Sequence, residues 1–283
     1  MIQYFKIADF PFAVCSETDV TSLLTNLLPF VCEGVDERQL LFTLTLDGAV
    51  NENRSVFYRS EEYDFSMAKA EGLYSIEFTD VSDGRNFIME FDGDFRNFRT
   101  NMCSNRLSGV LDNMLMLAYT FASAGCNALL VHASVVVVDG KAYIFLGKSG
   151  TGKSTHAGLW LKYIDGAVHL NDDNPVLKFS DGKVYACGSA WSGKGRIYKN
   201  EMYEVGGIVR LAQAPYNRIE RRTGAKAFAL VYTSCSKLPW SEQCMKNVCS
   251  TLGKVVSVTP VYYLECLPDR DAALLSFNTM KQL

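Results

Sequence analysis

The stretch that decides the fold is Phe145-Leu146-Gly147-Lys148-Ser149-Gly150-Thr151-Gly152-Lys153-Ser154-Thr155. It satisfies G-x-x-x-x-G-K-[ST], the Walker A pattern, whose glycines let successive backbone N–H groups turn inward around phosphate oxygens. In this pattern the lysine reaches the outer phosphates and the next hydroxyl binds Mg²⁺. An apolar run before the loop and helical spacing after it predict a strand, a loop and a helix. The alternative is a glycine-rich turn that binds no ligand. The predicted phosphate-binding residues are Gly147, Ser149, Gly150, Thr151, Gly152, Lys153, Ser154 and Thr155.

Composition excludes several kinds of partner. The chain has 283 residues and a formal net charge of −3, so it carries no basic field for nucleic acid or an anionic membrane surface. No apolar run is long enough to span a bilayer. The 9 cysteines are scattered, odd in number and without a C-x-x-C pair. With no signal peptide in view, they predict reduced thiols in a cytoplasmic protein.

The chain divides into two predicted domains. Residues 1–104 contain short strands separated by Asp-Gly turns, with a short helix at 20–30 and a strand at 40–46. This pattern predicts a mostly antiparallel α+β region of unknown role. Residues 105–283 carry the Walker A stretch and form the predicted nucleotide-binding domain.

The second domain is predicted to contain a mixed sheet. An apolar helix at 106–124 is followed by two apolar strands, and the turn Asp139-Gly140 leads back into the strand before the loop. Neighbouring strands joined by a tight turn are antiparallel, which excludes the Ras-like order with helical crossovers. Helices at 223–234, 242–251 and 269–277 and a strand-like run at 255–265 complete the prediction.

Four polar features accompany the loop: His132 before it, Asp172-Asp173 after it, and a glycine-rich segment with Lys194 and Arg196. In phosphoryl transfer one carboxylate holds Mg²⁺ and another orients or deprotonates the attacking hydroxyl. Adjacent carboxylates repel unless a cation lies near them, so the pair favours a metal. The alternative for the pair is a solvated turn. Lys194 and Arg196 fit a lid that brings cations to the phosphoryl group, or a solvated loop.

This arrangement resembles the HPr kinase/phosphorylase family and, more distantly, the ATP-dependent phosphoenolpyruvate carboxykinases. The resemblance lies in His132-Ala133-Ser134, the strand–turn–strand that follows, the Walker A stretch and Leu170-Asn171-Asp172-Asp173. It covers residues 131–174 firmly and the rest of the C-terminal half loosely, and it does not cover residues 1–104. The resemblance implies a carboxykinase-like P-loop core, that is, a mixed α/β (α+β) fold.

The resemblance also implies roles for individual residues. ATP phosphates would lie against Gly150 to Thr155, and Ser154 with Asp172 or Asp173 would hold Mg²⁺. The other aspartate would be the base, and His132 would contact the transferred phosphate or ligate a metal. The chain departs from the HPr kinases at Thr155, where they have Glu, and at Glu204-Val205-Gly206-Gly207, where their Arg is missing. The resemblance therefore does not name the acceptor.

These observations predict an ATP- and Mg²⁺-dependent kinase, with His132, Lys153, Asp172 and Asp173 as the catalytic residues. Its partners would be the nucleotide and a phosphoacceptor, either a protein or a small molecule. Two alternatives stay open: a regulatory module that binds ATP without turnover, and a carboxykinase-like enzyme. The sequence is compatible with a homo-oligomer.

Overall fold

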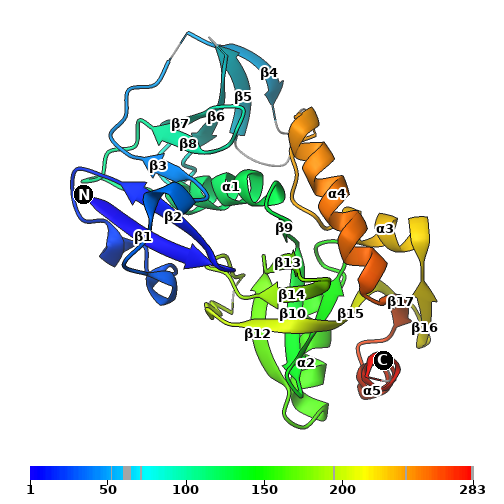
Figure 1. Ribbon diagram of the computed structural model, residues 1–283. Helices are drawn as coiled ribbons and strands as arrows, with labels where there is room; N and C mark the ends of the chain where they lie inside the picture. Colours follow the sequence, from blue (N-terminus) through cyan, green and yellow to red (C-terminus); the bar gives the residue numbers. More distant parts are fainter. Residues whose placement is uncertain (52, 60–64, 71, 194, 240, 282–283) are drawn as a thin grey trace. The chain divides into compact units, whose positions relative to one another are not determined.

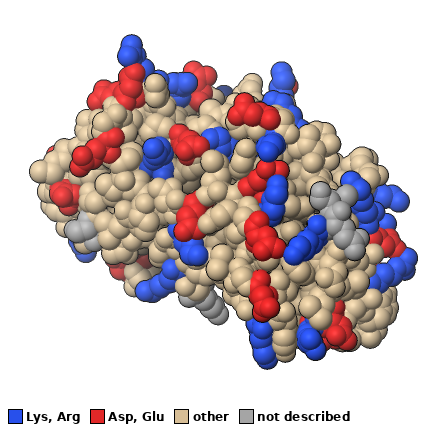
Figure 2. Space-filling view, turned by 60° about the horizontal axis from the view of Figure 1, so that its bottom comes forward, with Lys and Arg blue, Asp and Glu red and all other residues tan. Residues whose placement is uncertain are grey.

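The computed structural model describes residues 1–51, 53–59, 65–70, 72–193, 195–239 and 241–281 (Figure 1). It is a mixed α/β protein that divides into two compact units, Met1–Ser123 and Ala124–Leu283. Among the described helices, none combines the length and apolar character needed to cross a membrane. On the face drawn in Figure 2, acidic and basic side chains lie interspersed.

The first unit is built on an eight-stranded sheet with the order β1-β2-β3-β8-β7-β6-β5-β4. Strand β3 pairs in parallel with β2 and β8, and every other pair is antiparallel. The predicted antiparallel meander is therefore present. Its strands are β1 (Ile2–Ile7), β2 (Phe10–Cys15), β3 (Thr43–Thr45), β4 (Ser55–Arg59), β5 (Phe65–Ala70), β6 (Leu73–Thr79), β7 (Asn86–Phe91) and β8 (Asn97–Thr100).

Aromatic side chains form the core of this unit, together with helix α1 (Val110–Ala124). Phe12 stacks on Phe42 with ring centroids 4.9 Å apart and meets the Tyr119 ring edge-on at 6.0 Å. The Tyr119 hydroxyl donates a hydrogen bond to the carbonyl of Ile7. The predicted boundary near residue 104 assigns α1 to the C-terminal domain, whereas its contacts group it with the N-terminal sheet.

Two predictions in this unit are wrong in detail. The helix expected at 20–30 consists of separate 3₁₀ turns, Thr21–Leu23 and Leu28–Phe30, with a third at Glu37–Gln39. The chain leaves helical geometry at Leu24, where ψ is 59°, and Pro29 supplies no N–H to continue an α-helix. The strand expected at 40–46 is only Thr43–Thr45.

The second unit contains a mixed nine-stranded sheet, as the Asp139-Gly140 turn predicted. Strands β10 and β11 are antiparallel neighbours across that turn, and β11 then pairs in parallel with β15. The order is β12-β10-β11-β15-β14-β13-β9, and β17 joins β15 to β16. The strands are β9 (Ala128–Leu130), β10 (Ala133–Val138), β11 (Lys141–Leu146), β12 (Val168–Asp173), β13 (Val176–Ser180), β14 (Lys183–Cys187), β15 (Met202–Gln213), β16 (Arg218–Arg222) and β17 (Val261–Cys266).

Helices cover this sheet. Helices α2 (Lys153–Tyr163) and α5 (Arg270–Met280) contact each other and close a core that contains Trp160, Phe145 and Leu211. Helices α3 (Gly224–Tyr232) and α4 (Glu242–Val258) contact each other and the strands β17, β14, β13 and β9. Every residue of β10 is buried, as expected for a strand in the interior of a covered sheet.

The strand-like run predicted at 255–265 is wrong in its first part. Helix α4 continues to Val258, and only Val261–Cys266 is a strand. Val248, Leu252 and Val255 recur at helical spacing on one buried face, which keeps the segment helical. The helices predicted at 223–234 and 269–277 are confirmed as α3 and α5, within a few residues at each end.

Candidate functional site

The Walker A stretch connects the end of β11 to the start of α2, the context that a phosphate-binding loop requires. Gly150 and Gly152 have φ values of 76° and 105°, a conformation that other residues rarely adopt. Gly152 is the N-cap of α2 and carries no side chain to satisfy the first N–H groups of the helix. These N–H groups are therefore available to an anion.

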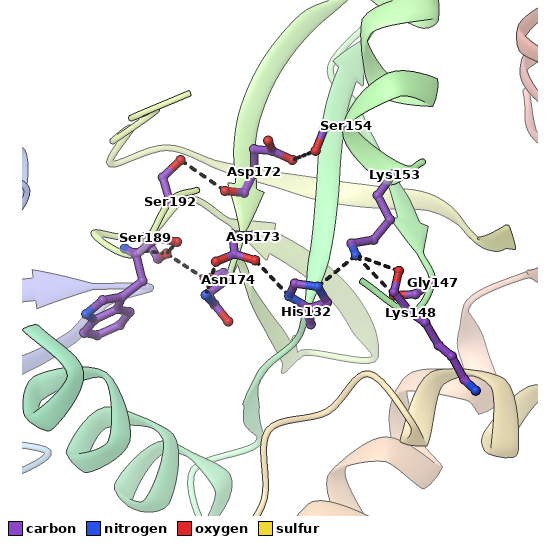
Figure 3. A network of polar contacts seen from close by, with 11 residues as sticks. His132, Gly147, Lys148, Lys153, Ser154, Asp172, Asp173, Asn174, Ser189 and Ser192 are labelled. Carbon is purple, nitrogen blue, oxygen red and sulfur yellow. Dashed lines mark hydrogen bonds and ion pairs between the residues drawn. The ribbon is translucent and has the colours of Figure 1, made fainter. Parts of the chain in front are cut away.

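The Lys153 ammonium lies at the centre of a polar network (Figure 3). Its Nζ is 2.8 Å from Nε2 of His132 and donates to the carbonyls of Gly147 at 3.2 Å and Lys148 at 3.4 Å. Burial lowers the pKa of Lys153, an effect that the nearby Asp173 and Asp172 oppose and Arg210 reinforces. The ammonium is thus close to two carboxylates and one guanidinium.

The contacts of His132 define which of its nitrogens carries the proton. A charged Lys153 can only donate, so Nε2 of His132 accepts. The other ring nitrogen, Nδ1, is 2.8 Å from Oδ1 of Asp173 and therefore donates to it. Figure 3 shows the imidazole between these two partners, with Nδ1 toward Asp173 and Nε2 toward Lys153. The contacts therefore favour a proton on Nδ1 and a lone pair on Nε2.

The acidic pair stands at the end of β12, which pairs with the start of β10. Successive side chains of a strand point to opposite sides, and the two aspartates have different partners. Asp172 accepts a hydrogen bond from the hydroxyl of Ser154 at 3.0 Å. Asp173 binds His132 and accepts from the amide of Asn174 at 3.0 Å. The two carboxylates therefore contact different side chains of the site.

The backbone around the acidic pair is held in an unusual conformation. Asp173 has φ 124°, which a non-glycine residue adopts only where its surroundings impose it. Ser192 donates its hydroxyl to the carbonyl of Asp172 at 3.1 Å, and the N–H of Gly193 donates to the same carbonyl. The segment after β14 thus fixes the acidic pair.

The oxygen donors of Ser154 and Asp172 fit Mg²⁺. This ion prefers carboxylate and hydroxyl oxygens, takes one or two protein ligands, and shares the rest of its sphere with phosphates and water. A hydroxyl and a carboxylate 3.0 Å apart at the start of α2 supply such a pair. Within the described part of the chain, no group of three or more His, Cys, Asp or Glu residues is arranged to hold a metal. These residues therefore do not form a metal site made entirely of such side chains. A site in which phosphate oxygens complete the coordination of the metal is still compatible with the structure.

Two hollows lie beside the loop and share part of their lining. The first, about 700 Å³, has mostly apolar walls from Leu159, Leu211, Cys266, Leu267 and Pro268. The second, about 440 Å³, is lined by Lys148 to Thr151 of the loop and by side chains from β15 and β17. Gln213 lines both hollows, and its amide donates to the carbonyl of Gly150 at 3.3 Å.

The structure brings together five of the residues that the sequence singled out: His132, Lys153, Ser154, Asp172 and Asp173. Lys194 lies outside the described residues. Arg196 is exposed and bonds Gly193 through its backbone N–H, while its guanidinium makes no hydrogen bond or ion pair with a described residue. A lid role for Lys194 and Arg196 stays a prediction.

Sequence reasoning missed Arg210 and Gln213, which reach the loop from β15. The sequence did contain an indication of Arg210, because this arginine interrupts the apolar run Gly207-Ile208-Val209-Arg210-Leu211. Burying a charged side chain in such a run is costly unless it is paired with another group.

The two other histidines have no part in the network. His156 is buried, with Nε2 3.0 Å from the Ser276 hydroxyl, and burial lowers its pKa to about 4. His169 contacts the Ser134 hydroxyl at 3.1 Å, and burial lowers its pKa as well.

Comparisons with known proteins add little to this geometry. No protein-family model matches the sequence, and no curated protein matches it. Among solved structures, the Hpr(Ser) kinase/phosphatase from Coxiella burnetii is similar over 54% of this chain and 93% of that chain, with 14% identity and a TM-score of 0.33. A likeness at this level carries no argument about function.

Proposed function

We propose that the second unit is an ATP- and Mg²⁺-dependent phosphotransferase of the HPr-kinase-like type, with a carboxykinase-like P-loop core, acting on a hydroxyl acceptor. The observation that carries the proposal is the network in which Ser154–Asp172 and Lys153–His132–Asp173 meet beside the glycine loop. A ligand-free turn would have no need for a buried lysine, an oriented imidazole and two carboxylates at one point.

Nucleotide binding would use the loop and Lys153. The free N–H groups at the start of α2 would accept the phosphates, and the ammonium would leave the carbonyls of Gly147 and Lys148 for the outer phosphates. The apolar hollow beside Leu159 and Leu211 has room for the nucleobase.

Ser154 and Asp172 would hold Mg²⁺ through their oxygens. When bound, this ion neutralises charge on the phosphates during transfer. The hydrogen bond between Ser154 and Asp172 holds both oxygen ligands in place before the ion binds. This lowers the entropic cost of ordering the two side chains.

Proton transfer would use His132 and Asp173 together. Once Lys153 turns to phosphate, the Nε2 lone pair of His132 is free to accept the proton of the acceptor hydroxyl. Asp173 keeps the opposite nitrogen protonated and stabilises the imidazolium that forms. The acceptor oxygen then forms its bond to the γ-phosphorus as the bond to the departing diphosphate breaks.

The test compares Lys153→Ala with Lys162→Ala, which removes an exposed ammonium from the other end of α2. We expect Lys153→Ala to lower the rate of ADP formation from ATP and Mg²⁺ roughly 10²–10³-fold and Lys162→Ala to leave it unchanged. Far-UV circular dichroism checks that both variants fold.

Full activity of Lys153→Ala would refute the phosphotransferase. Binding of ATP to the wild-type protein by calorimetry, without ADP formation or transfer of a labelled γ-phosphate, would favour the regulatory module instead. Formation of phosphoenolpyruvate from oxaloacetate and ATP would favour a carboxykinase.

A further inference from the structure

Arg210 stands beside the start of the phosphate-binding loop. Its register partner in the parallel pair β11–β15 is Leu146, the residue before Gly147 of the loop. Its neighbours Val209 and Leu211 are buried in the core under α2 and α5. Because side chains alternate along a strand, the Arg210 side chain lies on the other face of the sheet.

The guanidinium is held by the end of α3. Its Nη1 donates to the carbonyl of Leu230 at 3.1 Å, the hydroxyl of Thr233 at 2.7 Å and the hydroxyl of Ser234 at 3.3 Å. Its Nε and Nη2 groups make no hydrogen bond with any described residue. A guanidinium has five N–H donors, so this anchoring fixes its orientation and leaves most donors unused.

Arg210 lines the smaller hollow, together with Lys148, Ser149, Gly150, Thr151 and Tyr263. Among the described residues that line this hollow, none is acidic. The positive charge of Arg210 also acts on the Lys153 ammonium nearby. Two cations, Arg210 and Lys153, thus lie close to each other beside the loop, and an anion between them would relieve their repulsion.

The sheet order defines which side of the nucleotide Arg210 would contact. Strand β11, which leads into the loop, lies between β10 and β15. The acidic pair is on β12, beyond β10, whereas Arg210 is on β15. A phosphate bound at Lys153 would have Asp172 and Asp173 on one side and Arg210 on the other.

We propose that Arg210 is a further catalytic residue that binds the outermost phosphate of the nucleotide opposite the acidic pair. This inference rests on the proposed function. Arg210 neither gains nor loses a proton. Its donors stabilise the charge on the phosphoryl oxygens while the bond to the departing diphosphate breaks and the bond to the acceptor oxygen forms.

The experiment measures binding of ADP and of a non-hydrolysable ATP analogue, each with Mg²⁺, by calorimetry. We expect Arg210→Gln to weaken binding of the ATP analogue roughly 10- to 100-fold and binding of ADP less than about threefold, because only the analogue carries the outermost phosphate. Arg210→Lys, which keeps the charge but loses the fork of donors, should recover part of the difference. The control Arg221→Gln removes an exposed guanidinium on β16 and should change neither affinity.

A purely structural role would give a different result. Arg210 anchors Ser234, whose carbonyl accepts the backbone N–H of His132 at 2.7 Å, so loss of the anchor alone could disturb the site. Thr233→Val removes the closest acceptor while keeping the guanidinium. If Arg210→Gln weakened ADP and the ATP analogue equally, or changed neither, the inference would be refuted while the proposed function stood. A wild-type protein that bound neither nucleotide would overturn both.

Discussion

The replacement Asp173→Asn tests the proposed proton transfer most directly. It keeps the size of the side chain but removes the carboxylate that accepts the Nδ1–H of His132 at 2.8 Å. The new amide can instead donate to Nδ1, which would move the imidazole proton to Nε2, the nitrogen proposed to accept the substrate proton. The change therefore exchanges the roles of the two ring nitrogens of His132. It keeps His132 itself and a side chain of the same size at position 173.

The size of the effect follows from the bond that is lost. A hydrogen bond to a charged group contributes about 1.5–3 kcal/mol, which favours one proton position over the other roughly 10- to 150-fold. We expect the rate of ADP formation to fall by at least roughly tenfold. The corresponding replacement in serine proteases, where an aspartate orients a histidine in the same way, lowers kcat about 10⁴-fold, which sets an upper estimate. Nucleotide affinity should stay within about threefold, since Asp173 is not among the proposed phosphate or metal ligands.

Two measurements check this prediction. ADP formation at saturating ATP and Mg²⁺ gives the rate, with water as the acceptor. Nitrogen NMR of histidine-labelled protein reports the position of the His132 proton, and the chain has only 3 histidines to assign. Asp165→Asn, an exposed aspartate just after α2, is the matched control. A variant that binds nucleotide, keeps the proton on Nδ1 of His132 and turns over at the wild-type rate would show that Asp173 does not orient this histidine.

Three further predictions concern Asp172 as a proposed Mg²⁺ ligand, the buried His156, and Gly188 in the loop after β14. Asp172→Asn should weaken Mg²⁺-dependent nucleotide binding roughly tenfold and leave Mg²⁺-free binding unchanged, as magnesium titrations at fixed nucleotide would detect. The folded-state pKa of His156 is about 4 and its ordinary value is 6.5, so the unfolded chain binds more protons between these values and stability is lost as the pH falls through this range, by up to about 3 kcal/mol. Urea unfolding at pH 7 and pH 4.5 measures this loss, and a His156→Gln variant that folds should lose less. Gly188→Ala would place a methyl group against the Lys199 carbonyl oxygen and should lower the melting temperature by several degrees. Gly158→Ala, in open space within α2, should leave it unchanged or raise it.

Several features of this protein follow from short-range sequence rules. The Walker A stretch forms a strand, a loop and a helix because its glycines permit positive φ and its flanks carry strand and helix periods. The Asp139-Gly140 turn makes β10 and β11 antiparallel neighbours, which excludes the Ras-like order from sequence alone. The predicted meander of the first unit depends on the same turn chemistry.

Rules of this kind failed where a long-range contact or an interruption decided the outcome. The run at 255–258 has β-branched residues that favour a strand, yet its buried spacing continues helix α4. At 20–30 the apolar spacing suggested one helix, but Leu24 and Pro29 divide the segment into 3₁₀ turns.

The sequence by itself determined which residue types could meet at the loop: a lysine, a histidine, a hydroxyl and two carboxylates. Only the tertiary structure decided how they pair, with Asp172 on Ser154 and Asp173 on His132, because the alternation of β12 and its register against β10 separate the two side chains. The approach of Arg210 was also a tertiary outcome, since it depends on the parallel pairing of β11 with a strand about 60 residues later in the chain. The spacing of apolar residues within a segment is a local property, so helices and strands can be predicted from it. The pairing of distant strands depends on burial summed over the whole sheet, which local spacing does not reveal.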